Sequence, residues 1–210
     1  VRRVNRDNSY YARRQFVPEM ERVRSRIARS LGASPEEIAL TRNATEALQA
    51  LIGGYNRLSP GDAVLFADLD YDAMQTAMQW LKVRRGVDVV SIDLPEPATH
   101  QNLIDAYAAA LKANPRVRLM LLAHLSHRTG LVLPVAEIVA LARQRQVDVI
   151  VDSAHAWGQV DYKLDGLGVE FAGFNAHKWI GAPLGVGVMY IRRSRIGDID
   201  PFMGEASFPA

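Results

Sequence analysis

The 210-residue sequence contains no cysteine, which excludes a disulfide framework, a thiolate metal site and a cysteine nucleophile within this stretch. No apolar run approaches the roughly 20 residues that a membrane-spanning helix needs, and no secretory signal opens the sequence. Internal repeats and low-complexity segments are also lacking. We therefore expect a cytoplasmic protein without a membrane partner. Because the sequence starts at Val1 and ends in a loop-like stretch, we interpret it as a fragment or a processed product.

Positive charge is unevenly distributed, although the net charge is only +2. Residues 1–29 carry nine arginines and three acidic residues, a balance of +6, which leaves −4 for the remainder. A basic arm could contact nucleic acid or an acidic partner. The sequence has no basic patch with interspersed aromatic residues, as nucleic-acid binding would favour. A solvated helix face and a subunit contact explain the basic segment better. We expect no nucleic-acid partner.

Short apolar segments alternate with segments of helical periodicity, and 49% of the residues are hydrophobic. Strands are predicted at 38–41, 63–67, 87–92, 117–124, 147–151, 171–174 and 186–191. Helices are predicted at 20–31, from the cap Asn43 to Tyr55, and at 72–84, 102–113 and 135–144. Strands that are apolar on both faces indicate a covered, mostly parallel sheet. The predicted class is α/β, a three-layer αβα sandwich.

The domain organisation follows from this pattern. We expect a basic helical segment over 1–31 and one large domain over 32–194. Residues 195–210 are expected to begin the connection to a further C-terminal domain.

Polar residues cluster where the predicted strands end, which is where open α/β sheets bind ligands. The first group, Thr41–Glu46, is a strand-to-helix turn whose free amides and dipole favour a phosphate, with the Thr45 hydroxyl as a further donor. An ordinary helix cap is the simpler interpretation of this turn alone. Gly-x-Gly-x-x-Gly and Gly-Lys-Ser/Thr motifs are absent from it, so dinucleotide and P-loop sites lack their usual support.

Lys178 and Asp152 are the most informative pair. Asp152 ends one apolar strand and Lys178 follows another, within the run from Asn175 to Trp179. A lysine amine that forms an imine with an aldehyde, and a carboxylate that keeps a pyridine nitrogen protonated, are what pyridoxal phosphate requires. Apolar neighbours predict a desolvated lysine with a lowered pKa. A surface lysine and a turn-forming Asp are the alternatives, and a metal site formed by Asp152, His155 and His177 would lack a recognised ligand motif.

Several motifs together resemble class V aminotransferases of fold type I, in particular their isopenicillin N epimerase-like and cysteine desulfurase-like branches. The motifs are Asn43-Ala44-Thr45-Glu46-Ala47, Asp70-Tyr71, Ser126-His127-Arg128-Thr129-Gly130, Val151-Asp152-Ser153-Ala154-His155 and Asn175-Ala176-His177-Lys178-Trp179. They occur in the order found in that family and cover nearly the whole sequence.

The resemblance implies a role for each matching residue. Lys178 would be the Schiff-base lysine, Asp152 the partner of the pyridine nitrogen, and His155 a hydrogen-bond partner of the phenolic oxygen. The phosphate cup would comprise Ala44, Thr45, Asn175 and His177. Tyr71 would stack on the ring, and His127 would lie near the phenolic oxygen.

The resemblance also implies a function. We predict a pyridoxal-phosphate enzyme that acts on a small amino-acid substrate through an internal aldimine at Lys178, with epimerase, C–S lyase or aminotransferase-type chemistry. A homodimer is expected, and no metal. A tyrosine at position 71, where cysteine desulfurases have histidine, favours the epimerase-like branch. The alternatives are a cofactor-binding fragment or degenerate subunit without catalysis, and a cysteine desulfurase. The arginine that binds the substrate carboxylate is expected beyond residue 210. Within the sequence, Arg42 and Arg128 are weaker candidates for this role.

Overall fold

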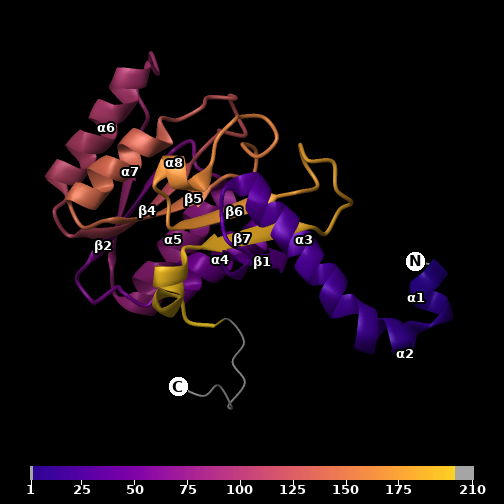
Figure 1. The fold of residues 1–210 in the computed structure, drawn as a ribbon. Helices are drawn as coiled ribbons and strands as arrows, with labels where there is room; N and C mark the ends of the chain where they lie inside the picture. Colours follow the sequence, from indigo (N-terminus) through magenta and orange to yellow (C-terminus); the bar gives the residue numbers. More distant parts are fainter. Residues whose placement is uncertain (1, 202–210) are drawn as a thin grey trace.

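A seven-stranded sheet forms the centre of the molecule in the computed structural model, which describes residues 2–201 (Figure 1). Its strands are β1 (Ile38–Thr41), β2 (Ala63–Ala67), β3 (Asp88–Ile92), β4 (Val117–Ala123), β5 (Asp148–Asp152), β6 (Phe171–Asn175) and β7 (Gly187–Ile191). The spatial order is β1-β7-β6-β5-β4-β2-β3. Strand β7 is antiparallel to both β1 and β6, and the remaining neighbours are parallel. The C-terminal ends of all the strands except β7 therefore lie at one edge of the sheet.

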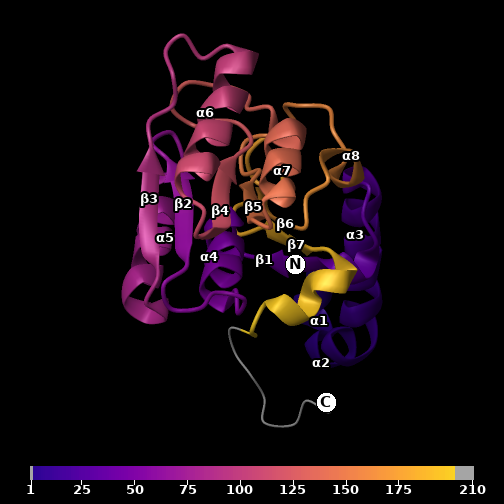
Figure 2. The ribbon, with the colours of Figure 1, turned by 90° about the vertical axis from the view of Figure 1, so that its left-hand side faces the viewer.

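Helices cover both faces of the sheet (Figure 2). On one face lie α6 (His100–Ala113), α7 (Val135–Gln144), the short α8 (Leu164–Leu167) and the end of α3 (Phe16–Leu31). On the other face lie α4 (Ala44–Gly54) and α5 (Asp72–Arg85). This arrangement confirms the predicted three-layer αβα sandwich with a mostly parallel sheet.

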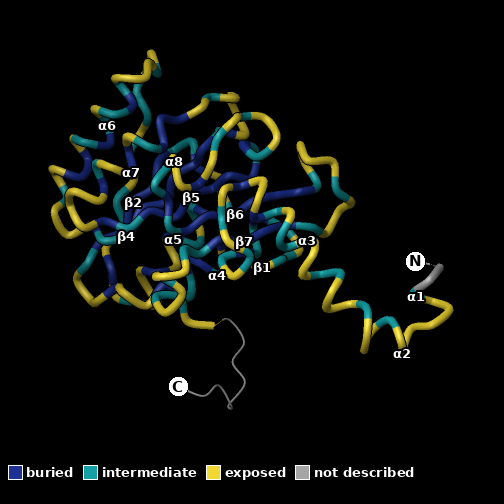
Figure 3. The backbone as a smooth tube through the Cα atoms, in the orientation of Figure 1, coloured by how far each residue is buried: buried dark blue, intermediate teal, exposed yellow. Residues whose placement is uncertain are grey.

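The strands in the middle of the sheet are buried on both faces (Figure 3). Every residue of β2 and β6 is buried, and the side chains of β4 divide between two apolar clusters, one under each helical layer. Removing this apolar surface from water is the main favourable contribution to folding. The same burial explains why the strands lack the alternation of a half-exposed sheet.

Most predicted helix and strand boundaries agree with the structure to within one or two residues. Helix α3 ends at Gly32, whose φ of 71° is the left-handed conformation expected of a C-terminal glycine. Helix α6 begins two residues before the predicted start, because the Thr99 side chain accepts a hydrogen bond from the Asn102 amide. Helix α8 was not predicted, since its four residues are too short to show a helical period.

The N-terminal segment is helical, as predicted. It comprises α1 (Arg2–Arg6), α2 (Asn8–Tyr10), a π-helical turn (Tyr11–Gln15) and α3, and it extends away from the sheet (Figure 1). Only Ala28 and Leu31, at the end of α3, are buried within that helix. The division into domains stays a prediction.

The predicted connection at 195–210 begins with a 3-10 helix, Arg193–Asp198, that is bonded to the sheet. The Arg195 guanidinium donates to Asp148, 3.0 Å away, and pairs with Glu170 and Asp198. Residues 202–210 of that prediction lie outside the described part of the chain. Within residues 2–201, no helix combines the length and apolar character needed to cross a bilayer.

Gly187, at the start of β7, allows the sheet to approach the beginning of α4. A Cβ atom at Gly187 would lie 2.4 Å from the Cα and carbonyl carbon of Asn43, and backbone atoms cannot move aside as a flexible side chain can. We expect Gly187→Ala to lower the free energy of unfolding by about 1–3 kcal/mol, measured by urea denaturation.

The control is Gly53→Ala in α4, where an added Cβ meets no atom within 4 Å. Because alanine favours a helix more than glycine does, this variant should be unchanged or more stable by up to about 1 kcal/mol. Equal stability of the two variants would contradict the close approach at Gly187.

Candidate functional site

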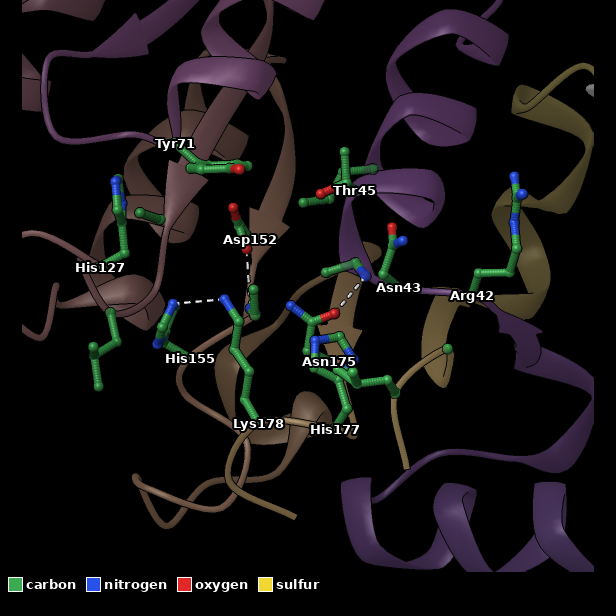
Figure 4. A pocket seen from close by; sticks show the side chains of 17 residues that line it. Arg42, Asn43, Thr45, Tyr71, His127, Asp152, His155, Asn175, His177 and Lys178 are labelled. Carbon is green, nitrogen blue, oxygen red and sulfur yellow. Dashed lines mark hydrogen bonds between the residues drawn. The ribbon is translucent and has the colours of Figure 1, made fainter. Parts of the chain in front are cut away.

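A cavity of about 480 Å³ lies at the edge where the strand ends meet (Figure 4). Its lining comes from the segments that follow β1, β2, β4, β5 and β6. The structure brings all the predicted site residues to this cavity: Ala44, Thr45, Tyr71, His127, Asp152, His155, Asn175, His177 and Lys178. Their placement agrees with the sequence prediction, whereas their roles are argued below.

Asp152 ends β5, and its carboxylate is buried at the bottom of the cavity, with 7% of the residue exposed. One oxygen accepts a hydrogen bond from the Ala154 amide, 2.9 Å away. Burial raises the pKa of Asp152, while the Ala154 amide, Lys178 and His127 each act to lower it. Among the described residues, Asp152 forms no ion pair within 4.0 Å. A buried carboxylate without a cation is costly, so this position favours a cationic ligand.

Lys178 approaches the same cavity from the segment after β6 (Figure 4). Its Nζ lies 2.6 Å from His155 Nε2. Partial burial lowers the pKa of Lys178, and the opposing effect of Asp152 is smaller. A lysine with a lowered pKa is more often neutral and able to attack a carbonyl carbon.

The surroundings of Lys178 differ from the sequence prediction in one respect. The apolar residues that follow it were expected to enclose it, but Trp179 is 53% and Leu184 is 87% exposed. Only the preceding residues, including Phe171 and Phe174, lie in the core. The segment after Lys178 forms the outer rim of the cavity, so the lysine remains open to solvent on that side.

Aromatic rings form one wall of the cavity. Tyr71 and His127 meet edge to face with ring centroids 5.2 Å apart, and His127 stacks on His155 at 6.5 Å. Tyr71 is 41% exposed, so part of its ring remains accessible. His127 and His155 thus lie side by side in this wall.

The start of α4 supplies hydrogen-bond donors on the opposite side. Asn43 caps the helix by accepting from the Glu46 amide at 2.8 Å, as predicted. The buried Asn175 side chain accepts from the Ala44 amide at 2.8 Å (Figure 4). Within the described part of the chain, the Thr45 amide and hydroxyl have no protein acceptor. The Ala44 amide already has an acceptor in Asn175, so the Thr45 amide and hydroxyl are the donors that remain for a phosphate.

The two arginines that we considered as ligands of a substrate carboxylate are already paired. Arg42 lines the cavity but donates to Glu46, with Nη2 to Oε1 at 2.9 Å, and Arg128 is bonded to Asp72. Neither arginine is therefore free to bind a ligand without giving up its partner.

The ring of His177 lies beside Asn175, with Nδ1 3.4 Å from the Val186 carbonyl oxygen.

Asp70 is a residue that the sequence interpretation used only as part of a motif. It is 1% exposed, and its two oxygens accept from the Ala67 and Ala123 amides, each at 2.7 Å. It thereby joins the ends of β2 and β4. A buried Asp between two strand ends has no distinct signal in a single sequence, because turn-forming Asp residues occupy similar positions.

The arrangement as a whole offers three different chemical groups to one ligand. The start of α4 favours an anion, Lys178 supplies an amine nucleophile, and the Asp152 carboxylate favours a cation. Residues 2–201 contain no group of three or more His, Cys, Asp or Glu side chains placed to hold a metal ion.

Comparison with known proteins shows which family the chain resembles. The family model described as aminotransferase class-V matches residues 3–208. The isopenicillin N epimerase of Streptomyces clavuligerus is 33% identical over 179 residues, which cover 85% of this chain and 44% of the epimerase. A probable L-cysteine desulfhydrase of Arabidopsis thaliana is 33% identical over 198 residues, which cover 88% of this chain and 42% of that protein.

Solved structures extend the comparison to the fold. A C-DES variant with glycine covalently linked to its PLP cofactor superposes with a TM-score of 0.87 and 27% identity, covering 94% of this chain and 52% of C-DES. The cystine C–S lyase C-DES with its reaction product cysteine persulfide gives a TM-score of 0.79 at 27% identity, covering 95% of this chain and 55% of that one. The chain thus spans about half the length of the relatives that it matches.

Asp70 makes a testable contribution to the pH dependence of stability. Burial raises its pKa from 3.8 to about 7, helped by the charges of Asp152 and Asp68 and opposed by the Ala67 and Ala123 amides. A group whose pKa is higher in the folded state stabilises the fold at low pH, and this contribution is lost as the pH rises through the folded-state value. Asp70 should therefore lower the free energy of unfolding between about pH 4 and pH 7, by up to about 4 kcal/mol.

The measurement compares wild type with Asp70→Asn by urea denaturation across this range. Asparagine does not titrate, so the difference between the two proteins isolates Asp70 from groups such as His124, whose pKa burial lowers to about 4. We expect the advantage of wild type to decrease as the pH rises. A difference that stays constant from pH 4 to pH 7.5 would refute this assignment.

Proposed function

The chain belongs to the class-V aminotransferase family, and from this premise we propose that it carries the pyridoxal-phosphate site of an enzyme that acts on an amino acid. Pyridoxal phosphate is the cofactor of this family, and the relatives include an epimerase and C–S lyases. Since the chain spans about half of those relatives, the activity of the whole protein is part of the proposal.

The observation that carries the proposal is that Asp152 and Lys178 line the same cavity. The buried, unpaired carboxylate favours a protonated pyridine nitrogen, since that cation would replace the lost solvation. Lys178, with its lowered pKa, would bind the aldehyde carbon covalently. An ordinary surface lysine and an ordinary turn-forming aspartate would not be expected to line the same cavity.

The phosphate would lie at the start of α4. Thr45 offers both its amide and its hydroxyl there, and the positive end of the helix dipole adds to the attraction. His177 lines the same side of the cavity. Asn175 contributes indirectly, because its bond to the Ala44 amide attaches the helix start to the end of β6.

When bound, the cofactor supplies an electron sink for the charge left on the α-carbon of an amino acid. Asp152 favours the protonated ring that makes this sink effective. As a free amine, Lys178 would accept the α-proton of the amino acid at Nζ, and its lowered pKa suits it to act as that base. His155 holds the lysine amine by a 2.6 Å contact and orients it toward the cavity.

The proposal also extends to the type of reaction that follows proton removal. Tyr71 forms the aromatic wall where cysteine desulfurases carry a histidine, which favours epimerase or C–S lyase chemistry over desulfuration. A homodimer, a cytoplasmic location and a C-terminal domain with the carboxylate-binding arginine stay predictions from the family. The alternative of a fragment or degenerate subunit that binds the cofactor without turnover also stays a prediction. The predicted site residues all line the cavity, which argues against the degenerate subunit.

Lys178→Ala tests the covalent attachment. Wild type mixed with pyridoxal phosphate should develop the visible absorbance of the lysine-bound cofactor, and borohydride should fix the cofactor to the peptide that contains residue 178. The variant should lose this band, because Lys178 is the one lysine among the described residues that line the cavity. Absorbance spectra and peptide mass spectrometry measure both effects.

Lys112→Ala is the matched control, since Lys112 is an exposed lysine in the last turn of α6. It should bind the cofactor like wild type. If Lys178→Ala retained an unchanged band that borohydride still reduced, the proposed function would be wrong.

A further inference from the structure

Trp179, His155 and Lys178 form a row of hydrogen-bonded nitrogen atoms at the rim of the cavity. The Trp179 indole Nε1 donates to His155 Nδ1 at 3.4 Å, and His155 Nε2 lies 2.6 Å from Lys178 Nζ. Figure 4 shows the second of these contacts, with the His155 ring and the lysine amine facing each other. The chemistry of each group decides which atom carries the proton.

The direction of the first bond is fixed, because an indole nitrogen can only donate. His155 Nδ1 must therefore accept and carries no proton in this arrangement. Burial is the largest influence on His155 and lowers its pKa, so its neutral form predominates. In a neutral imidazole, one nitrogen carries the proton and the other does not, so the proton lies on Nε2.

The second bond then has one consistent direction. His155 Nε2–H donates, and Lys178 Nζ must accept through a lone pair, which only the neutral amine has. An ammonium group on Lys178 would need the lone pair of Nε2, and the imidazole proton would then move to Nδ1 and face the indole N–H. The contact between Trp179 and His155 disfavours that arrangement.

We propose that Trp179 is a positioning residue that holds His155 in the Nε2–H tautomer and thereby keeps the Lys178 amine neutral and ready to attack a carbonyl carbon. The inference rests on the proposed role of Lys178 and adds a residue that does not itself touch the reacting atoms. Trp179 is 53% exposed, so burial of the indole ring alone does not explain its position.

The charges around Lys178 do not reverse this conclusion. Asp152 favours the ammonium form, but its effect is smaller than that of burial. His127 is a second imidazole near the row and stacks on His155 at 6.5 Å. Arg42 lines the same cavity, and its charge is paired with Glu46. The tautomer of His155 therefore adds to burial as a local influence on the protonation of Lys178.

The first test is ¹⁵N-histidine NMR of the protein without cofactor, with the His155 signals assigned by His155→Gln. We expect a pyrrole-type nitrogen at Nε2 and a pyridine-type nitrogen at Nδ1. Wild type with the proton on Nδ1 would overturn the proposal, whether or not any Trp179 variant folds.

The second test uses Trp179→Phe, which keeps an aromatic ring and removes the N–H. The fraction of the Nδ1–H tautomer should increase several-fold. The pKa of Lys178 should rise by about half a unit to one unit, since Nε2 can then accept from an ammonium group. The pH profile of labelling of Lys178 by a small aldehyde with cyanoborohydride, followed by peptide mass spectrometry, measures this shift.

Trp80→Phe is the control, because Trp80 is similarly exposed at 50% but lies in α5, beneath Arg84. It should leave both the His155 tautomer and the Lys178 profile unchanged. An unchanged tautomer and profile in Trp179→Phe would show that Trp179 only packs at the rim. Neither measurement needs pyridoxal phosphate, so this inference can fail while the Lys178→Ala result still supports the proposed function.

Discussion

The buried carboxylate of Asp152 is the constraint on which the rest of the site depends. A carboxylate that loses its water without gaining a cation costs free energy, and burial raises its pKa accordingly. The surrounding fold tolerates this cost at the end of a central strand, where the Ala154 amide is the one hydrogen-bond donor to the carboxylate among residues 2–201. A cationic group of a ligand next to Asp152 would offset the cost.

The elements around Asp152 are held by polar bonds between distant parts of the sequence. Asp70 joins the ends of β2 and β4, and Asn175 joins the end of β6 to the start of α4. These bonds are buried, so breaking one leaves an unsatisfied backbone amide. They connect the strand ends into one edge, while the rim after Lys178 is exposed to solvent.

The sequence was sufficient to predict the sheet, the helices and the composition of the cavity, because apolar strands and polar strand ends leave strong local patterns. It was not sufficient where a contact depends on residues that are distant in the sequence. The apolar residues after Lys178 suggested that they enclose the lysine, but they lie at the surface, and the bond between the Ala44 amide and Asn175 has no local signal. The roles of Asp70 and Trp179 likewise depend on partners that no spacing in the sequence reveals.

These features make the cavity a site for one ligand with an anionic end, a carbonyl carbon and a basic ring nitrogen, which is the description of pyridoxal phosphate. The most direct measurement is a crystal structure of the protein with this cofactor. We expect electron density that continues from Lys178 Nζ into the cofactor, with the ring nitrogen bonded to Asp152 and the phosphate at Thr45. A cofactor bound elsewhere, or in this cavity with its ring nitrogen turned away from Asp152, would contradict it.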